Sequence, residues 1–431
     1  MEIFKLVHVT VTVILLACFA YRFFYIPVSL LMKKKTKPET AAQNRYAILI
    51  CARNEEKVIA DLIGSIKSQT YDAGLLSVFV IADNCEDMTA DVARAAGASV
   101  YERFNTQLVG KGYALDELVK HISRDYPNRY DGYFVFDADN ILDPDYIEKM
   151  NLTFSEGCEI VTGYRNSKNY GDNWISAGYS LWFMHSSRFL NQARSLLGLS
   201  CNVSGTGFLF SQSILDKTNG WQFHTLTEDF EFTIHHILNG EKVGFCLDAV
   251  LYDEQPVKFR QSWHQRTRWA KGYLQVFGRY CSSLFRGAAR GNFSCFDLGI
   301  DTISSVILTA ASVTFSIALF IIMLVNGESV LSMLQTAGRA IICMYLAQFI
   351  MAIFTTVSEW NKIRASSSKK LIYTLTFPIF MFTYIPVSLS ALFAKAEWKP
   401  IEHRVSASTL GDSFNARSAR GKKRAEIKGQ P

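Results

Sequence analysis

The chain has 431 residues, of which 49% are hydrophobic and 13% are aromatic. This composition is too apolar for an ordinary soluble two-domain protein and excludes collagen-like, disordered and disulfide-rich classes, so we expect part of the chain to lie in lipid. The 45 Lys and Arg residues outnumber the 39 Asp and Glu residues, which gives a net charge of +6. That mild excess suits anionic membrane surfaces or phosphorylated ligands, but it is too diffuse for a nucleic-acid-binding protein.

The nine cysteines are scattered along the chain, and no two of them form a Cys-x-x-Cys pair. We therefore expect reduced thiols facing a cytosol, most of them small buried hydrophobic residues. The pattern predicts neither a structural zinc site nor a disulfide framework.

The first apolar stretch, Phe4–Met32, is long enough to cross a bilayer, whose core takes roughly 20 helical residues. It has almost no basic residues before it, no small-residue cleavage site, and an apolar run too long for a signal peptide, which predicts an uncleaved anchor in residues 1–37. A basic cluster, Lys-Lys-Lys-Thr-Lys, follows at 33–37. Under the positive-inside rule the N-terminus lies outside, and the chain from residue 38 onward is cytosolic.

We assign residues 38–255 to a cytosolic α/β domain, because short apolar strands alternate there with amphipathic helices. This pattern predicts a mostly parallel sheet with helices on both faces. The predicted strands are Tyr46–Cys51, Leu76–Ala82, Ser99–Glu102, Gly132–Asp137 and Glu159–Tyr164, and the predicted helices are Glu55–Gln69 and Thr89–Ala96.

Polar side chains follow three of these strands directly, at the edge where the ligand crevice of such a sheet lies. Asp137 and Asp139 come at the end of a fully apolar strand, two residues apart and therefore on one side of the chain. Two hard anionic oxygens at this spacing suit Mg²⁺ or Mn²⁺, which could neutralise a diphosphate leaving group. An Asp-x-Asp at a strand end is as often a solvated turn with a helix cap, and the motif alone leaves both interpretations open.

Asp83 follows the second predicted strand, and Asn54 and Glu55 follow the first. Asp83 is either a turn aspartate that accepts local backbone hydrogen bonds or an acceptor for a nucleotide base or ribose. Lys111, in the run Gly-Lys-Gly, could present a point charge to phosphate, although a solvated loop is the more common origin of so short a motif.

The segment Thr-Leu-Thr-Glu-Asp at 225–229 precedes an amphipathic helix, Phe230–Leu238. Thr225 and Glu228 have the spacing of a capping box, which places Asp229 in the first helical turn. Its carboxylate there either compensates the helix dipole or acts as a general base, which has to be deprotonated and within hydrogen-bond reach of an attacking hydroxyl. The sequence alone leaves both interpretations open.

Aromatic and basic side chains mix in Gln261–Tyr280, which favours an amphipathic helix in the headgroup region of a membrane. Arg268 could in addition clamp a diphosphate bidentately, and the indole of Trp269 could stack on a sugar or a base. We assign residues 256–296 to interfacial helices, 297–395 to transmembrane helices and 396–431 to a basic tail.

Three further apolar stretches follow, Ile303–Val325, Ala340–Val357 and Leu371–Phe393. Their interiors hold no charged residue, so Arg22 in the anchor is the only charge inside a predicted span. Four crossings from an outside N-terminus leave the tail outside, although it is strongly basic. Either the positive-inside rule fails here, or one stretch is interfacial, the candidates being Leu371–Phe393, which contains two prolines, and the short Ala340–Val357.

Four elements occur along the chain in a recognisable order: Asp83, then Asp137-x-Asp139, then Thr227-Glu228-Asp229, then Gln265-Arg266-Thr267-Arg268-Trp269. In this order they resemble the motifs of membrane-embedded family 2 glycosyltransferases, which include cellulose, chitin, hyaluronan and poly-N-acetylglucosamine synthases and nodulation-type chitooligosaccharide synthases. The resemblance covers residues 45–400. The last element matches the Gln-x-x-Arg-Trp signature in full, a pattern associated with processive members and also found in some lipid glycosyltransferases.

The resemblance implies an α/β, GT-A-like (Rossmann-like) cytosolic domain with transmembrane and interfacial helices. It implies that Asp83 contacts the uridine of a UDP-sugar, and that Asp137 and Asp139 hold its diphosphate together with Mg²⁺ or Mn²⁺. The implied catalytic base is Asp229, next to Glu228, and it deprotonates the acceptor hydroxyl.

Further residues match the family pattern around this core. Gln265, Arg268 and Trp269 line the implied acceptor and diphosphate side. Asn54 and Glu55 match an Asn-Glu after the family's first strand, and Lys111 stands where the family has a Gly-Lys that approaches the nucleotide.

The implied activity is inverting transfer of a hexose or N-acetylhexosamine from a UDP-sugar to a growing β-linked polysaccharide, at the cytoplasmic face of the cell membrane. One carboxylate base and a metal-bound leaving group suggest a single displacement. The alternatives are a non-processive transfer to a membrane lipid and, outside enzymes, a degenerate scaffold or transporter subunit. The retained carboxylates and the uncharged spans disfavour the last of these.

Two features of the C-terminal region bear on assembly and topology. Only three apolar stretches follow the catalytic domain, so a complete polymer channel could require a second copy or an accessory subunit. The segment Trp398–Arg404 loosely resembles a gating segment of some synthases, which lies on the cytosolic side. That likeness places the tail inside and conflicts with the count of four crossings.

Overall fold

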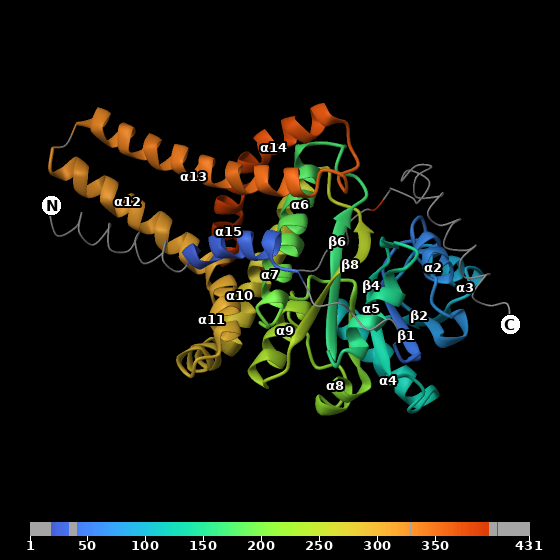
Figure 1. The fold of residues 1–431 in the computed structure, drawn as a ribbon. Helices are drawn as coiled ribbons and strands as arrows, with labels where there is room; N and C mark the ends of the chain where they lie inside the picture. Colours follow the sequence, from blue (N-terminus) through green and yellow to red (C-terminus); the bar gives the residue numbers. More distant parts are fainter. Residues whose placement is uncertain (1–18, 34–40, 328, 396–402, 404–431) are drawn as a thin grey trace.

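Eight strands form one mixed sheet in the order β3-β2-β1-β4-β7-β6-β8-β5 (Figure 1). The structure, a computed structural model, describes residues 19–33, 41–327, 329–395 and 403. The strands are β1 Tyr46–Ala52, β2 Leu76–Asp83, β3 Ser99–Arg103, β4 Gly132–Asp137, β5 Ile141–Leu142, β6 Ile160–Ser167, β7 Phe208–Ser211 and β8 Val243–Asp253. The prediction of parallel strands is correct for β3, β2, β1 and β4, but β7 runs antiparallel between β4 and β6, and β5 runs antiparallel to β8.

Helices cover both faces of this sheet, as predicted, because alternate strand residues point to opposite sides. Ile48 and Ile50 of β1 are buried in one core, together with residues of α2 Ile59–Lys67 and α5 Tyr146–Ser155. Leu49 is buried in the other core, with residues of α4 Lys111–Asp125. The remaining helices of the domain are α3 Thr89–Ala95, α6 Trp174–His185, the π-helical turn η2 Ser186–Asn191, α7 Gln192–Leu196, α8 Gln212–Lys217 and α9 Glu228–Leu238.

The predicted helix Glu55–Gln69 begins later than expected, at Ile59. Asn54 has a φ of 58°, which is left-handed, and residues 53–58 form a turn before the helix starts. The backbone N–H of Glu55 donates to Thr89 Oγ1 across that turn at 2.7 Å. The turn keeps Asn54 and Glu55 at the strand end rather than on the helix.

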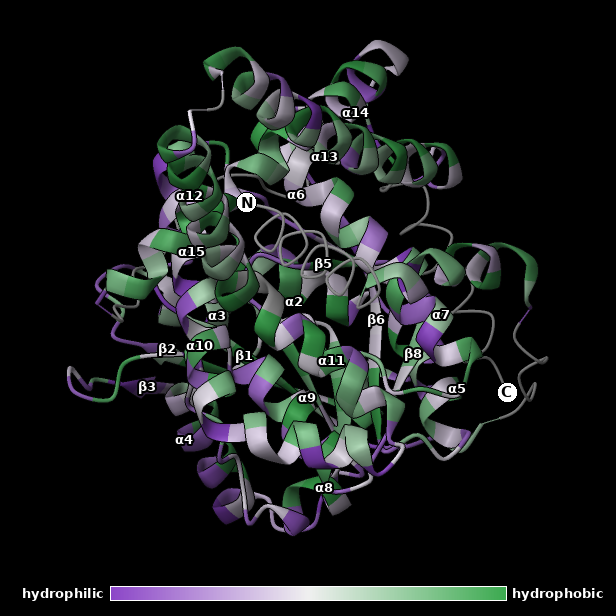
Figure 2. Cartoon of the chain, turned by 90° about the vertical axis from the view of Figure 1, so that its left-hand side faces the viewer, coloured by the Kyte–Doolittle hydropathy of each residue, from purple (hydrophilic) through white to green (hydrophobic). Residues whose placement is uncertain are grey.

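A helical region follows the sheet domain and projects from one side of it (Figure 1). Its helices are α10 Phe259–Ala289, α11 Phe293–Ile303, the π-helical turn η3 Ser304–Leu308, α12 Thr309–Val325, α13 Val330–Ser358, α14 Ser367–Phe382 and α15 Tyr384–Phe393. Among the described residues three helical stretches are long and apolar enough to cross a membrane: Val306–Val325, Val330–Ser358 and Ser367–Phe393. Figure 2 shows hydrophobic residues along α12, α13 and α15.

Two of these stretches differ from the predicted spans. The helix that contains Ala340–Val357 begins ten residues earlier, at Val330, so the exposed Arg339 lies within it. The prediction that Arg22 is the only charge inside a span is therefore wrong, because Arg339 is a second one. The last stretch is broken at Thr383, between α14 and α15, and Pro378 lies inside α14.

The last apolar stretch also lies against the sheet domain. Lys369 Nζ donates to the carbonyl oxygen of Gly171 at 2.6 Å, and Thr383 Oγ1 accepts a hydrogen bond of 2.6 Å from buried Arg266 of α10. The Arg266 guanidinium lies 4.7 Å from the ring centroids of both Phe380 and Tyr384. Both halves of this stretch are thus fixed to the helices that border the domain.

The described part of the N-terminal anchor is a helix, Phe19–Leu31, while residues 1–18 of the predicted stretch lie outside the described residues. A buried ionic cluster joins this helix to α7 and α11. Arg194 of α7 donates to both carboxylate oxygens of Asp297 at 2.7 and 3.0 Å, and both side chains are 1% exposed. Tyr25 donates to Asp297 at 2.8 Å, and Arg22 lies 2.8 Å from Asp301.

Candidate active site

The carboxyl ends of three parallel strands meet at one edge of the sheet. Ala52 of β1 is paired in register with Ala82 of β2, and Cys51 with Asp137 of β4. Asp83, the turn at Asn54, and Asp137 are therefore neighbours, as the sequence predicts. None of the cysteines in the described part of the chain, Cys51 among them, forms a disulfide.

Asp83 lies at the base of this edge and is 5% exposed. Its carboxylate accepts a hydrogen bond of 2.6 Å from Arg103, which also donates to Glu117 and to the carbonyl oxygen of Leu108. Burial raises the pKa of Asp83, and the guanidinium of Arg103 opposes that rise. Asp83 is thus held in one orientation by an ion pair.

Lys111 opens α4 and faces the same edge. Its amine donates to the carboxylate of Asp137 and, at 2.7 Å, to the carbonyl oxygen of Gly205. Burial alone would lower the pKa of Lys111, but the carboxylates of Asp137 and Glu228 raise it above its ordinary value. The lysine therefore keeps its positive charge beside the two carboxylates.

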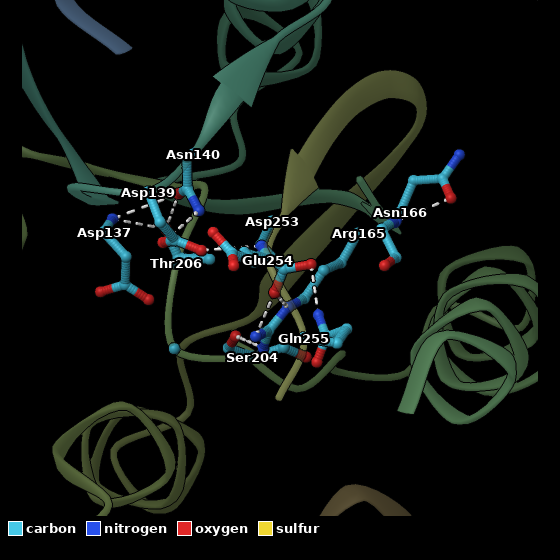
Figure 3. A network of polar contacts seen from close by, with 12 residues as sticks. Asp137, Asp139, Asn140, Arg165, Asn166, Ser204, Thr206, Asp253, Glu254 and Gln255 are labelled. Carbon is cyan, nitrogen blue, oxygen red and sulfur yellow. Dashed lines mark hydrogen bonds and ion pairs between the residues drawn. The ribbon is translucent and has the colours of Figure 1, made fainter. Parts of the chain in front are cut away.

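Asp137 and Asp139 stand on either side of a tight turn after β4, in the polar network of Figure 3. The backbone N–H of Asp137 donates to Thr206 Oγ1 at 2.9 Å, and Asp139 Oδ2 accepts from the backbone N–H of Glu254 at 2.8 Å. Burial would raise the pKa of Asp139, but the positive charges of His403 and Lys168 and the Glu254 N–H hold it below its usual value. Asp139 therefore keeps its negative charge.

The predicted capping box at Thr225 and Glu228 is wrong. Helix α9 begins at Glu228, its N-cap is Thr227, and the Thr225 hydroxyl makes no hydrogen bond among the residues described. The carboxylate of Glu231 instead accepts the backbone N–H groups of His224 at 3.1 Å and Thr225 at 3.0 Å. A buried charge from the next turn of the helix thus replaces the expected hydroxyl cap.

Asp229 lies in the first turn of α9, as predicted, and its carboxylate is near Gly205. A Cβ placed on Gly205 would lie 3.7 Å from Asp229 Oδ2, and the Gly205 carbonyl is the one that Lys111 binds. Burial raises the pKa of Glu228 to about 7 and raises that of Asp229, while the charges of Lys111 and Arg268 oppose both shifts. Asp229 and Asp137 thus both lie near Lys111, whose charge lowers the pKa of Asp229 and whose amine binds Asp137.

Three further predicted site residues, Gln265, Arg268 and Trp269, lie on α10. Arg268 donates to the carbonyl oxygen of Leu226 at 2.9 Å, directly before the acidic pair. The Trp269 ring packs edge-on against Tyr179 and Phe183, with centroids 5.8 and 6.1 Å away. Gln265 Oε1 is buried and accepts no hydrogen bond from any described residue.

The sequence reasoning missed Arg165, which lies near the end of β6, and Asp253, which ends β8 (Figure 3). Arg165 Nε donates to Asp253 at 2.5 Å, NH1 donates to the Ser204 carbonyl at 2.8 Å, and the guanidinium lies 3.7 Å from the Phe183 centroid. Burial raises the pKa of Asp253 to about 6, against the charge of Arg165. Each follows an apolar strand run, the same signal that identified Asp83 and Asp137.

Asn54 and Glu55 use their side chains differently from a simple nucleotide contact. Asn54 Oδ1 accepts from the backbone N–H of Glu86 at 2.9 Å and so joins two strand-end loops. Both carboxylate oxygens of Glu55 lie 2.9 Å from His403 Nδ1, and these residues border a cavity of about 260 Å³. Burial opposes protonation of His403, but Asp139 and Glu55 raise its pKa to about 10, so the ring is charged.

The family model described as "Glycosyltransferase like family 2" matches residues 43–272 of this chain. The match covers more than half of the sequence, and the protein belongs to the family 2 glycosyltransferases. The matched region contains the strand-end carboxylates, the acidic pair of α9 and the Gln-x-x-Arg-Trp segment of α10. The resemblance stated from the motifs is therefore confirmed.

Curated relatives match the same region. A probable glycosyltransferase, YdaM of Bacillus subtilis, is 26% identical over 271 residues, 56% of this chain and 58% of that protein. A beta-monoglucosyldiacylglycerol synthase of Synechocystis is 26% identical over 256 residues, 56% of this chain and 50% of that protein. A poly-beta-1,6-N-acetyl-D-glucosamine synthase of Staphylococcus epidermidis is 24% identical over 247 residues, 56% of this chain and 58% of that protein. The chain spans about half the length of these relatives.

A solved structure with a similar fold is the mannosyltransferase PcManGT from Pyrobaculum calidifontis, in complex with GDP-Man and Mn²⁺. It has a TM-score of 0.56 and 15% identity, and the match covers 88% of this chain and 96% of that one. The predicted GT-A-like fold class is confirmed by this likeness and by the family match.

Proposed function

We propose that this glycosyltransferase transfers a hexose or N-acetylhexosamine from a UDP-sugar to a growing β-linked glycan, with inversion. The observation that carries the proposal is that Asp229 lies beside Gly205, while Lys111 binds both the Gly205 carbonyl and the carboxylate of Asp137. The proposed base, Asp229, and the cation that would bind the diphosphate, Lys111, are thus both next to Gly205. A sugar bound there would lie beside both groups.

Asp229 is the proposed base. It takes the proton of the acceptor hydroxyl as that oxygen forms a bond to the anomeric carbon of the donor. The bond from this carbon to the diphosphate oxygen breaks, and UDP leaves with the electron pair. Attack from the face opposite UDP inverts the configuration, so an α-linked donor gives a β-linked product. Burial raises the pKa of Asp229, which strengthens it as a base, and the charges of Lys111 and Arg268 limit that rise.

The donor lies along the strand ends in this proposal, with Asp83 at the uridine and Lys111 at the diphosphate. Asp137 and Asp139 would hold Mg²⁺ or Mn²⁺, and such an ion neutralises charge on the departing diphosphate. Among the described residues no three His, Cys, Asp or Glu side chains are placed to hold a metal by themselves. Two carboxylates suit an ion that takes its other ligands from phosphate oxygens and water, so the donor set fits.

The acceptor lies on the α10 side, where Gln265, Arg268 and Trp269 border the crevice. Trp269 stands in an aromatic cluster with Tyr179 and Phe183, and aromatic faces suit the apolar faces of sugar rings. The unpartnered Oε1 of Gln265 is an acceptor for a sugar hydroxyl. A sugar chain is therefore the better-supported acceptor.

The catalytic domain, residues 38–255, is proposed to be cytoplasmic at the cell membrane, with interfacial helices in 256–296, transmembrane helices in 297–395 and a basic tail in 396–431. The basic link between α13 and α14 packs on the domain, where Lys362 lies 4.0 Å from the Tyr164 ring and Arg364 lies 4.4 Å from that of Tyr252. His403 lies beside Glu55 in the same domain. Both contacts support a cytosolic tail, which requires that within 297–395 the helices α12 and α13 cross the membrane while Ser367–Phe393 lies at its surface.

A lipid acceptor is the second candidate. The Synechocystis relative is a beta-monoglucosyldiacylglycerol synthase, and the membrane-side position of α10 suits an acceptor that stays in the bilayer. Transfer of one sugar would then end the reaction.

Product size separates these two activities. The full chain, purified in lipid nanodiscs with Mg²⁺ or Mn²⁺, is incubated with radiolabelled UDP-sugars, with and without added diacylglycerol. We expect a ladder or a high-mass product resistant to lipid extraction. A single labelled glycolipid would instead establish the second candidate, and no transfer from any UDP-sugar would refute both.

The base is tested in the same assay by Asp229→Asn, which keeps the shape of the side chain. We expect turnover to fall by at least about 10²-fold, the lower range for a general base, with UDP binding retained. Asp125→Asn, at an exposed position of α4, is the matched control and should keep full turnover. Normal turnover in Asp229→Asn would remove this residue from the mechanism.

A further inference from the structure

Helix α10 carries positive charge without compensation along its own length. Its 31 residues include six basic side chains, Arg260, Arg266, Arg268, Lys271, Arg279 and Arg286, and no acidic one. Arg266 is buried against α14 and α15, Arg268 faces the crevice, and Arg279 pairs with Glu231. The basic side chains that remain for an outside ligand are Arg260 at the start of the helix, Lys271 in its middle and Arg286 at its end, where Arg290 follows directly after the helix.

A cavity of about 510 Å³ lies at that end, between the last turns of α9 and α10 and the start of α11. Arg286 and Arg290 line it together with Tyr280, Ser283, Asn239 and Asn292, and none of its described lining residues is acidic. Tyrosine, serine and asparagine side chains are hydrogen-bond donors that suit phosphate oxygens. The cavity therefore has the polarity of an anion site.

The two arginines contrast with the other guanidinium groups of the protein. Arg103, Arg165 and Arg194 each form an ion pair with a carboxylate: Arg103 with Asp83, Arg165 with Asp253, and Arg194 with Asp297 and Asp301. Arg286 donates only to the Ser282 carbonyl and the Ser283 hydroxyl, both at 3.3 Å. Neither Arg286 nor Arg290 forms an ion pair with any residue in the described part of the chain.

The turn between α10 and α11 lies on the side of the domain from which the α12–α13 hairpin projects (Figure 1). The Phe293 ring packs against Tyr21 of the N-terminal helix, with centroids 5.4 Å apart. Phe285 is 61% exposed on the turn of α10 next to the cavity. A large exposed aromatic side chain beside unpaired arginines is typical of a segment at the level of lipid headgroups.

We infer that this cavity binds the headgroup of an anionic phospholipid of the inner leaflet. Arg286 and Arg290 receive the phosphodiester, Ser283 and Asn292 complete its hydrogen bonds, and Phe285 inserts beside the acyl chains. The bound lipid fixes the end of the helix that carries Gln265, Arg268 and Trp269. The inference depends on the membrane placement proposed above, but not on the transfer reaction.

Native mass spectrometry of the full chain in neutral detergent measures this binding directly, with phosphatidylglycerol and phosphatidylcholine as probes. We expect retention of one phosphatidylglycerol and at least about tenfold weaker retention in the double variant Arg286→Gln and Arg290→Gln, since each basic residue near an anionic lipid contributes about 1 kcal/mol. Lys120→Gln with Arg124→Gln removes the same charge from exposed positions of α4 and should bind as the wild type does. Arg286→Lys with Arg290→Lys should keep most of the binding.

Three results would overturn the inference: equal retention of the two lipids, unchanged phosphatidylglycerol binding in the glutamine variant, or displacement of phosphatidylglycerol by millimolar inorganic phosphate. The last would mean that the cavity takes free phosphate. Asp229→Asn should bind the lipid at the wild-type level, because the cavity lies outside the crevice. Its lipid binding and its turnover are separate readouts, so failure of the transfer mechanism and failure of the lipid site are distinguishable.

Discussion

Replacing Glu231 by glutamine should slow the reaction without weakening the donor site. Glu231 is 0% exposed, and its carboxylate accepts the backbone N–H groups of His224 and Thr225. It also pairs with Arg279 of α10. The glutamine keeps the size of the side chain but removes its charge. The loop that leads into Asp229 would then be held less firmly.

The magnitude follows from these contacts. A hydrogen bond to a charged acceptor contributes about 1.5–3 kcal/mol and a neutral one about 0.5–1.5 kcal/mol, so weakening two bonds lowers the stability by about 2 kcal/mol. The pair with Arg279 adds less than about 1 kcal/mol, because solvent screens a guanidinium that is 56% exposed. A misplaced base that loses about 1.4 kcal/mol of transition-state stabilisation slows turnover about tenfold.

The assay is steady-state transfer in nanodiscs, together with the thermal unfolding midpoint of the same preparation. We expect Glu231→Gln to lower kcat about tenfold, with KM for the UDP-sugar changed by less than about twofold, because the loop supports the base and not the uridine side. Glu159→Gln, which removes an exposed pair with Lys217, is the control and should change neither value. An unchanged kcat, or a rise in KM alone, would refute the positioning role.

Three further outcomes are expected. Burial raises the pKa of Glu228 to about 7. The folded protein therefore loses stability as the pH rises from about 4.5 to about 7, because the buried side chain has to ionise. Glu228→Gln should unfold at a higher temperature than the wild type above pH 7, with no difference near pH 4.5. A Cβ on Gly112 would lie 2.2 Å from the Phe223 carbonyl oxygen, so Gly112→Ala should lower stability by about 1–3 kcal/mol and reduce kcat/KM. A Cβ on Gly64 would meet nothing within 4 Å, so Gly64→Ala should stabilise the protein by up to about 1 kcal/mol. Chelation of divalent ions should abolish transfer, and full activity in chelator would exclude a metal at the two strand-end carboxylates.

The strand ends were predictable from the sequence because their chemistry is local. A run of apolar residues followed by Asp83 or by Asp137 identifies both the strand and the edge at which it ends. The parallel pairing of β1 with β2 and β4 then brings those ends together without any further information. The motif order added the family, which the family model confirms.

The remainder depended on contacts between distant segments. Strand β7 has four residues and lies between β4 and β6, a placement that no local pattern encodes. The capping prediction failed because buried Glu231 binds the backbone ahead of α9 more strongly than the Thr225 hydroxyl would. Arg165 could have been found from its strand end, but its partner Asp253 lies on a strand that was not predicted.

The buried cluster at Asp297 has a consequence for how the enzyme can be handled. Arg194 belongs to the sheet domain, Asp297 to α11, and Tyr25 to the N-terminal helix, so this ionic cluster joins three parts of the protein. Cutting away the N-terminal helix would open Asp297 and the apolar surface around it to water. A shortened chain would therefore be more soluble, but its interface between α7 and α11, next to the catalytic domain, would be hydrated and less stable.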